Sequence, residues 1–326
     1  MYPMWSRQAD WDRRYHEAFQ HAVNATTFYT GSHVDEDDLL PTKPECPICG
    51  YSGPRPNILA LQRHPTVDLL SCPACRGYSA SRTPTTQRLR EYYTAYYRDS
   101  PVAVTCHAPS HFARHLFRIG RNYLRQESIA ILDYGGGSGA IATALSRLLL
   151  LNHASSAHVT VVDLHREPMD SSANMMPVTW YETLAGVEGR RFDLVLASAI
   201  LEHVPHPQGD LARLLRALRP GGIFYARTPS VAALMGIFAR LGIRYDFTYP
   251  AHLHDLGQAF WEKALDRIPE PDGTFRLLRS CPSLVETGLR SNPARTIAAH
   301  LLKSIWRLAG SSWALGGGWE VLIQRG

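Results

Sequence analysis

The stretch 129–142, which reads IAILDYGGGSGAIA, constrains the fold of this chain more than any other part of the sequence. Its apolar run is typical of a buried strand, the glycines allow a tight turn, and a helical pattern begins directly after them. Amide groups at the start of such a helix attract a carboxylate or a phosphate. The stretch therefore predicts a strand, a ligand-binding turn and a helix, although a tight turn without a ligand fits the same glycines.

Apolar runs and helical patterns alternate along the C-terminal part of the chain. The runs lie at 129–133, 158–163, 192–198 and 222–227, and the helical patterns between them lie at 139–151 and 208–218. Such alternation is typical of a parallel sheet covered by helices on both faces. We therefore expect an α/β fold with a doubly wound sheet, completed by an antiparallel strand at 317–324.

An acidic residue ends the second of these strands. Asp163 follows the run VTVV, and an acid at this place in a dinucleotide-binding fold accepts hydrogen bonds from ribose hydroxyls. A strand, a glycine turn, a helix, a second strand and an acid in this order are far more specific than glycines alone. They predict a site for a ligand that carries a ribose.

Four cysteines form two pairs with metal-ligand spacing. The pairs are Cys46 with Cys49 and Cys72 with Cys75, each of the form C-P-x-C, and 22 residues separate them. Two residues between ligands let one turn offer both sulfurs to a zinc ion, and four thiolates leave no open coordination position. The spacing favours a structural zinc ribbon over two disulfides or chance.

The composition places the chain among ordinary globular proteins. It has 326 residues, of which 45% are apolar and 19% charged, with a formal net charge of +5. Because no apolar run is long enough for a bilayer and the N-terminus lacks a signal-peptide core, we expect a cytoplasmic protein without a membrane segment. We expect a helix and linker at 1–43, the ribbon at 44–80, a helical linker or lid at 81–126 and the catalytic domain at 127–326.

The glycine turn and the segments after it resemble the class I S-adenosylmethionine (SAM)-dependent methyltransferases. That family's first motif is similar to 133–139, its fourth strand to FDLVLAS at 192–198, and its Pro-Gly-Gly turn to 220–222. The LEHVPHP turn at 201–207 is similar to that of ubiquinone O-methyltransferases. The resemblance implies SAM as the cofactor, bound by Asp133, Gly135, Gly136, Gly137, Gly139, Asp163 and Ser198. Asp163 lies further past the glycines than the family's pattern, because the intervening helix and loop are longer.

A zinc ribbon ahead of this domain resembles two groups of methyltransferases. One contains the sugar C-methyltransferases, whose Tyr-rich helix after the ribbon is similar to EYYTAYY at 91–97. The other contains ribosomal RNA guanine methyltransferases, whose last zinc ligand is often a histidine. The four cysteines of this chain fit the first group better.

Candidates for a proton acceptor lie just past the fourth strand and in a later segment. Glu202 and His203 follow the fourth strand, and His252 and His254 belong to YPAHLHD at 249–255, which is similar to a segment that closes over the acceptor in related methyltransferases. Histidine suits reversible proton transfer near neutral pH, although His203 equally fits a structural role in its turn. Relatives with a Glu-x-x-Glu-His turn bind a divalent cation there, whereas Ala199 replaces the first acid of that motif here.

Three further segments leave their roles open. The tyrosines at 92–97 pack under the ribbon or cover the cofactor as a lid. The arginines of a helix predicted at 110–126 form a solvated face or bind phosphate. An amphipathic helix within 281–312 offers a homodimer surface or a pocket wall, and a further amphipathic helix is expected at 5–24.

The sequence as a whole predicts a SAM-dependent methyltransferase that acts on a small-molecule acceptor, a sugar or a specialised metabolite. The modest positive charge favours this reading over an RNA methyltransferase whose ribbon recognises nucleic acid. The intact glycine turn, Asp163 and the LEH turn favour both enzymes over a non-catalytic SAM-binding protein.

Overall fold

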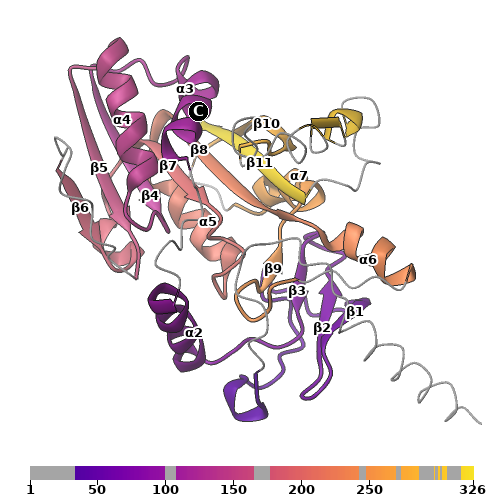
Figure 1. Cartoon of the computed structure of the whole chain (residues 1–326). Helices are drawn as coiled ribbons and strands as arrows, with labels where there is room; N and C mark the ends of the chain where they lie inside the picture. The colour runs from indigo at the N-terminus through magenta and orange to yellow at the C-terminus, as the bar shows by residue number, and fades with distance from the viewer. Residues whose placement is uncertain are drawn as a thin grey trace, which may run out of the picture.

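A computed structural model describes residues 34–99, 108–164, 177–241, 247–268, 273–285 and 317–326, together with 297, 300, 301 and 303–306. The helix expected at 5–24 lies outside these residues, as do Cys106 and most of 281–312. Figure 1 shows a large sheet flanked by helices, with a smaller sheet against one end of it.

The large sheet confirms the predicted α/β class. Its strand order is β10-β11-β8-β7-β4-β5-β6, with β4 to β8 parallel and the last two strands antiparallel. The strands are β4 (Ser128–Tyr134), β5 (Ser156–Val162), β6 (Val178–Tyr181), β7 (Phe192–Ser198), β8 (Leu218–Ser230), β10 (Phe275–Pro282) and β11 (Gly317–Arg325). The sequence patterns missed β6 and β10, which form the two edges of the sheet.

Helices cover both faces of this sheet (Figure 1). One face carries α3 (Pro109–Gly120) and α4 (Ala140–Asn152), and the other carries α5 (Pro207–Arg216), α7 (Gln258–Ala264) and the short 3-10 helix η3 (Leu265–Arg267). A further 3-10 turn, η2 (Leu184–Val187), follows β6.

Helix α3 ends at Gly120, six residues before the predicted end. A Cβ on Gly120 would lie 3.2 Å from Ile223 Cδ1, so the helix approaches β8 closely there before the chain turns toward β4. The four arginines of the predicted stripe, at 114, 118, 121 and 125, are exposed.

The small sheet joins the cysteine region to a distant part of the chain. Its order is β1-β2-β3-β9, all antiparallel, with β1 (Asn57–Gln62), β2 (Val67–Ser71), β3 (Tyr78–Ala80) and β9 (His254–Asp255). Because β9 comes from the C-terminal half, the ribbon and the large domain share one sheet. The predicted domain boundaries stay a prediction.

Three further elements surround the small sheet. These are the 3-10 turn η1 (Glu36–Asp38), helix α2 (Thr86–Asp99) and helix α6 (Ala232–Arg240). The first turn of α6 is capped by the buried carboxylate of Asp255, whose Oδ2 accepts hydrogen bonds from the amides of Val231 and Ala232. The cap ties β9 to the end of β8.

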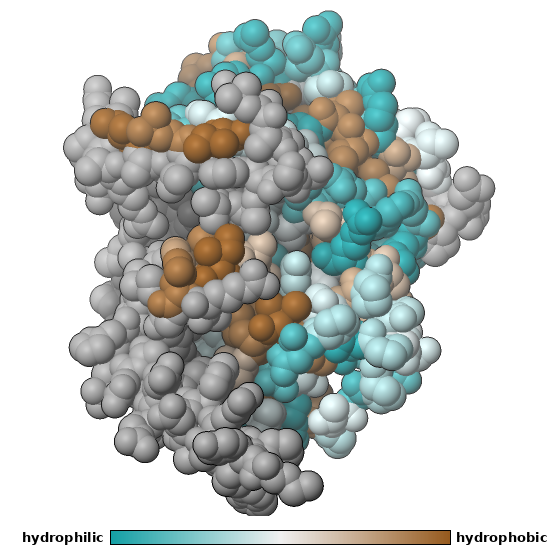
Figure 2. Space-filling model, turned by 90° about the vertical axis from the view of Figure 1, so that its right-hand side faces the viewer, coloured by the Kyte–Doolittle hydropathy of each residue, from teal (hydrophilic) through white to brown (hydrophobic). Residues whose placement is uncertain are grey.

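The surface around α6 carries exposed apolar side chains. Ile237 and Leu241 are 42% and 67% exposed, and such side chains stand in separate groups on this side of the molecule (Figure 2). Among the described residues, no helix has the length and apolarity needed to cross a membrane.

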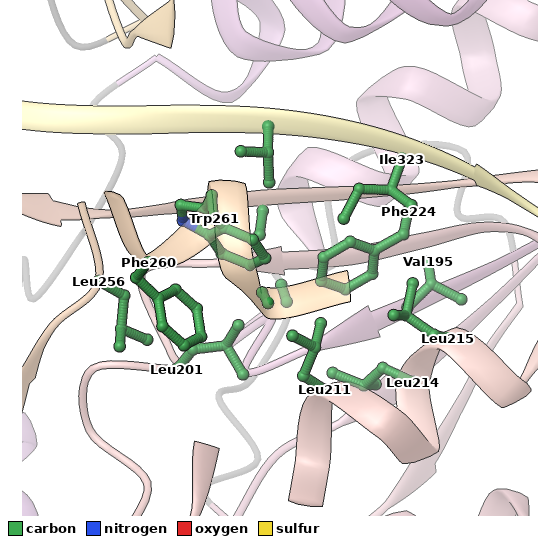
Figure 3. Close-up of a cluster of buried hydrophobic side chains, with 14 of the residues drawn as sticks. Val195, Leu201, Leu211, Leu214, Leu215, Phe224, Leu256, Phe260, Trp261 and Ile323 are labelled. Carbon is green, nitrogen blue, oxygen red and sulfur yellow. The ribbon is translucent and has the colours of Figure 1, made fainter. Parts of the chain in front are cut away.

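The main core lies between β7, β8, α5 and α7. Figure 3 shows Trp261 and Phe260 of α7 beside Phe224 of β8 and Leu211 of α5. Trp261 is 1% exposed, and its indole N–H donates to Thr228 Oγ1 at 3.0 Å. A large aromatic ring with a satisfied polar atom fixes α7 on the sheet.

Trp261→Ala should therefore lower the free energy of unfolding by about 3–5 kcal/mol, because it removes a buried ring and leaves a cavity. Urea titration followed by circular dichroism measures the change. Leu151→Ala is the control, because Leu151 is 82% exposed and its loss should cost less than about 0.5 kcal/mol. Equal costs for the two variants would contradict this assignment of the core.

Candidate functional site

The four cysteines predicted as metal ligands come together at one point. Their four sulfurs all lie within 4.8 Å of one another, with Cys46 Sγ 3.9 Å from Cys75 Sγ and Cys49 Sγ 3.7 Å from Cys72 Sγ. Zinc–sulfur bonds of about 2.3 Å give sulfur–sulfur separations of about 3.8 Å in a tetrahedron. The cluster therefore fits a tetrahedral metal ion, and all four cysteines are free thiols.

The two cysteine turns share one backbone geometry. In the first, the Gly50 amide donates to the Cys46 carbonyl and the Cys46 amide to Tyr51. In the second, the Arg76 amide donates to the Cys72 carbonyl and the Cys72 amide to Gly77. Gly50 and Arg76 both have a left-handed backbone, with φ of 74° and 59°. The left-handed step at Gly50 thus has a counterpart at Arg76 that the sequence does not reveal, because arginine rarely adopts this conformation.

The glycine turn adopts the backbone that its composition predicts. Gly135, Gly137 and Gly139 have φ of 70°, 54° and 69°, in the region that favours glycine. A Cβ at Gly135 would lie 2.5 Å from Ile200 Cγ1, and one at Gly136 would lie 2.5 Å from Asp133 Cγ. The turn therefore has no room for a side chain at these two positions.

The two acids predicted for the cofactor site lie on either side of this turn. Asp163 accepts a hydrogen bond from the Gly137 amide at 2.8 Å, which fixes the turn against the end of β5. Asp133 is 3% exposed, and burial together with the negative charge of Asp163 raises its pKa to about 7. Two carboxyl groups beside the glycine turn suit a ligand that carries both a cation and hydroxyl groups.

Ser198 ends β7 at the same edge of the sheet. It is half-buried and lies opposite Arg227 of β8 in the strand register. The next residue, Ala199, has a left-handed φ of 57°, which turns the chain sharply into the LEH segment. Ser198 therefore ends its strand directly before the segment that carries His203.

His203 is held by two groups that meet at one ring nitrogen. Its Nδ1 lies 2.8 Å from the Ala251 carbonyl oxygen and 3.0 Å from the Tyr93 hydroxyl of α2. A carbonyl oxygen only accepts hydrogen bonds, so Nδ1 carries the proton and Nε2 keeps its lone pair. Burial lowers the pKa of His203 to about 4, so the imidazole is neutral at pH 7.

His252 lies against His203, whereas His254 faces another partner. The rings of His203 and His252 have centroids 4.8 Å apart, and burial together with His203 lowers the pKa of His252 well below its usual value. His254 Nε2 donates to the Val204 carbonyl at 3.0 Å, and burial lowers its pKa to about 3. His254 thus ties β9 to the LEH turn.

Glu202 brings a buried carboxylate to the same place. It is 2% exposed, and its side chain forms a cluster with His203 and His252 whose potential ligand atoms lie within 4.8 Å of one another. The cluster has the donor set of a divalent cation site. The sequence identified the three residues of this cluster as candidates, but only the fold brings them together.

Tyr93 is the residue of this site that the sequence could not single out. It belongs to a run of four tyrosines, and spacing alone does not show which of them reaches a histidine. Its ring packs edge-on against both Tyr92 and His203.

Comparisons with known proteins agree with this geometry. Residues 110–270 match a family model described as a methyltransferase domain. The ubiquinone biosynthesis O-methyltransferase of Paramagnetospirillum magneticum is 30% identical over 201 residues, which cover 60% of this chain and 74% of that protein. The enzyme of the same name from Methylobacterium sp. (strain 4-46) is 30% identical over 151 residues, which cover 44% of this chain and only 58% of that protein.

A plantazolicin methyltransferase solved with S-adenosylhomocysteine (SAH) is similar at 16% identity, with a TM-score of 0.45. The match covers 72% of this chain and 89% of that one.

Asp163→Ala should raise the Kd for SAH about 10- to 100-fold, because it removes a charged acceptor and releases the Gly137 amide. Isothermal titration calorimetry measures the change. Asp266→Ala, at an exposed acid on η3, is the control and should leave the Kd unchanged. Unchanged affinity in Asp163→Ala would remove this acid from the cofactor site.

The order of the strands, the glycine turn with its two acids and the match to relatives lead to one assignment. The relative from Paramagnetospirillum magneticum is matched over most of its length, and the family model matches the region from α3 to beyond α7. The chain belongs to the class I SAM-dependent methyltransferases.

Proposed function

We propose that the protein transfers the methyl group of SAM to a hydroxyl group of a small-molecule acceptor, with Nε2 of His203 as the proton acceptor. The observation that carries the proposal is the neutral His203, held through Nδ1 at the carboxyl end of β7. The O-methyltransferases among the relatives support an oxygen acceptor.

The donor and acceptor sides of the site lie next to each other. Ile200, three residues before His203, packs directly over Gly135 of the glycine turn. A methyl donor bound at the turn would therefore lie close to the LEH segment. Because methyl transfer depends mainly on alignment of the two reactants, this closeness is the main requirement for catalysis.

The reaction needs one proton acceptor. The acceptor oxygen attacks the methyl carbon as the carbon–sulfur bond of SAM breaks, and SAH leaves with the bond electrons on sulfur. The hydroxyl proton passes to His203 Nε2, whose lone pair is set by the hydrogen bond at Nδ1. Tyr93 and the Ala251 carbonyl orient the ring.

A second proposal follows from the cluster of Glu202, His203 and His252. A divalent cation held there would bind the acceptor oxygen and lower its pKa, so that no protein base is required. The two readings differ in their response to EDTA, which should leave activity unchanged if His203 acts as the base and abolish it if a cation is needed.

The four cysteines would hold one structural zinc ion. The tetrahedral spacing of their sulfurs supports this, and the four thiolates leave no position for substrate.

The acceptor is tested by giving the protein methyl-labelled SAM and a lysate of its source. Label in the small-molecule fraction would support the proposal, and the mass and NMR spectrum of the product would separate an O-methyl compound from a C-methylated sugar. Label in RNA or protein would overturn it.

His203→Asn should lower kcat about 10²- to 10⁴-fold and leave SAH affinity unchanged, because it removes a base and not a cofactor ligand. His206→Asn, at an exposed histidine of the same turn, is the control. Full turnover in His203→Asn would refute a catalytic role for this residue.

The pH dependence gives an independent prediction for the wild-type enzyme. The base must be neutral, and its lowered pKa of about 4 means that activity is lost only as the pH falls through that value. We expect kcat/KM to stay flat between about pH 5.5 and pH 8, measured with SAM saturating. A loss of activity centred near pH 6.5 would indicate that an exposed histidine is the base instead of His203.

Zinc content is measured by mass spectrometry of the native protein, which should carry one zinc ion per chain. Cys49→Ser should lose it, because three remaining thiolates bind zinc more weakly than four, and Cys281→Ser should keep it. Wild-type protein that is fully stable without zinc would contradict a structural zinc ion in the ribbon.

A further inference from the structure

The ribbon is hydrogen-bonded to the segment that carries His252. Strand β3 pairs with β9 through Tyr78 opposite Asp255 and Ser79 opposite His254. The Ala80 amide also donates to the Leu253 carbonyl at 2.9 Å. The backbone next to His252 is therefore held by a strand that begins three residues after the last cysteine.

The same segment is hydrogen-bonded to the LEH turn. The amides of Leu253 and His254 donate to the carbonyl of Glu202 at 2.8 and 3.2 Å. Both peptide groups of Leu253 are thus engaged, its carbonyl with the ribbon and its amide with the turn. A displacement of β3 would move Leu253 against Glu202 and His203.

Side-chain packing follows the same route. Ile48 of the first cysteine turn lies in one buried cluster with Phe260 of α7, and a Cβ at Gly77 would lie 2.8 Å from Ile48 and 3.5 Å from Phe260. Figure 3 shows Phe260 beside Leu256 and Leu201, the residue before Glu202. Arg267 of η3 donates to the Ala74 carbonyl between the second pair of cysteines at 2.7 Å.

The ribbon also positions the other neighbour of His203. Helix α2 follows β3 after five residues and brings Tyr93 to His203 Nδ1. The Tyr249 hydroxyl donates to the Arg82 carbonyl at 3.2 Å, which joins the start of α2 to the His252 segment. Tyr93 and the Ala251 carbonyl, which meet at one nitrogen, are both placed from the ribbon.

We propose that the four-cysteine ribbon is a positioning element of the acceptor site, which sets His203 and His252 through β3–β9 pairing and through α2, and does not serve stability alone. The inference rests on the proposed function for the role of His203. The hydrogen bonds that carry it end on 202–203 and 249–267, and none of them ends on the glycine turn. Loss of the metal should therefore disorder the acceptor side and leave the cofactor side intact.

The test compares the full-length protein before and after zinc removal with a thiol-reactive mercurial, followed by reloading with zinc. Hydrogen exchange is read at the Ala80 and Leu253 amides and, for comparison, at β4 and α4. SAH affinity is measured on the same samples. We expect faster exchange at the two amides, unchanged protection of β4 and α4, unchanged SAH affinity, and recovery on reloading.

A second variant keeps the cysteines and removes only the hydrogen bond between β3 and Leu253. Ala80→Pro removes the amide that donates to Leu253, so it should retain one zinc ion and SAH affinity while kcat falls about 10- to 100-fold on the acceptor found by labelling. Ile58→Ala on β1, an exposed side chain at the far edge of the small sheet, is the control and should retain full activity.

Two outcomes would overturn the inference. If exchange at Leu253 is unchanged without zinc, the ribbon does not hold the segment. If β4 protection and SAH binding are lost together with zinc, the ribbon serves global stability. Both readouts are independent of methyl transfer, so a failure of the proposed function leaves this test intact.

Discussion

The hydrogen bonds from the amides of Leu253 and His254 to the carbonyl of Glu202 hold together the two segments of the proposed acceptor side. They place the Ala251 carbonyl beside His203 Nδ1 and His252 beside the His203 ring. Two side-chain bonds join the same segments, from His203 to the Ala251 carbonyl and from His254 to the Val204 carbonyl. Backbone and side-chain hydrogen bonds together thus bring two sequence motifs into one site.

The fold was predictable where burial leaves a regular pattern in the sequence. The central strands β4, β5, β7 and β8 are apolar because helices cover both their faces. The edge strands β6 and β10 have no such constraint, and β10 carries Arg276 and Arg279 beside a register shift. The arginines of β10 hide its strand pattern, and β6 is only four residues long. The early end of α3 depends on contact between Gly120 and Ile223, which are far apart in the sequence.

The candidate site shows the same difference between local and non-local features. The cysteine pairs and the glycine turn are local motifs, so their spacing alone predicted a four-cysteine cluster and a tight turn after the strand at 129–133. The acceptor side is assembled from 93, 202–203 and 251–252, and no local pattern states which tyrosine meets which histidine. Residue types identified the candidates, and only the pairing of β3 with β9 shows how they come together.

Burial of the histidines explains why their orientation depends on short-range contacts. A charged imidazole would be costly in this environment, so His203 and His252 are neutral. A neutral ring is oriented only by hydrogen bonds and packing, which are short-ranged and tolerate little displacement. The acceptor side therefore needs a rigid frame close to it. The ribbon, whose two cysteine turns meet at one point, would supply that rigidity in few residues once its four sulfurs hold a metal ion.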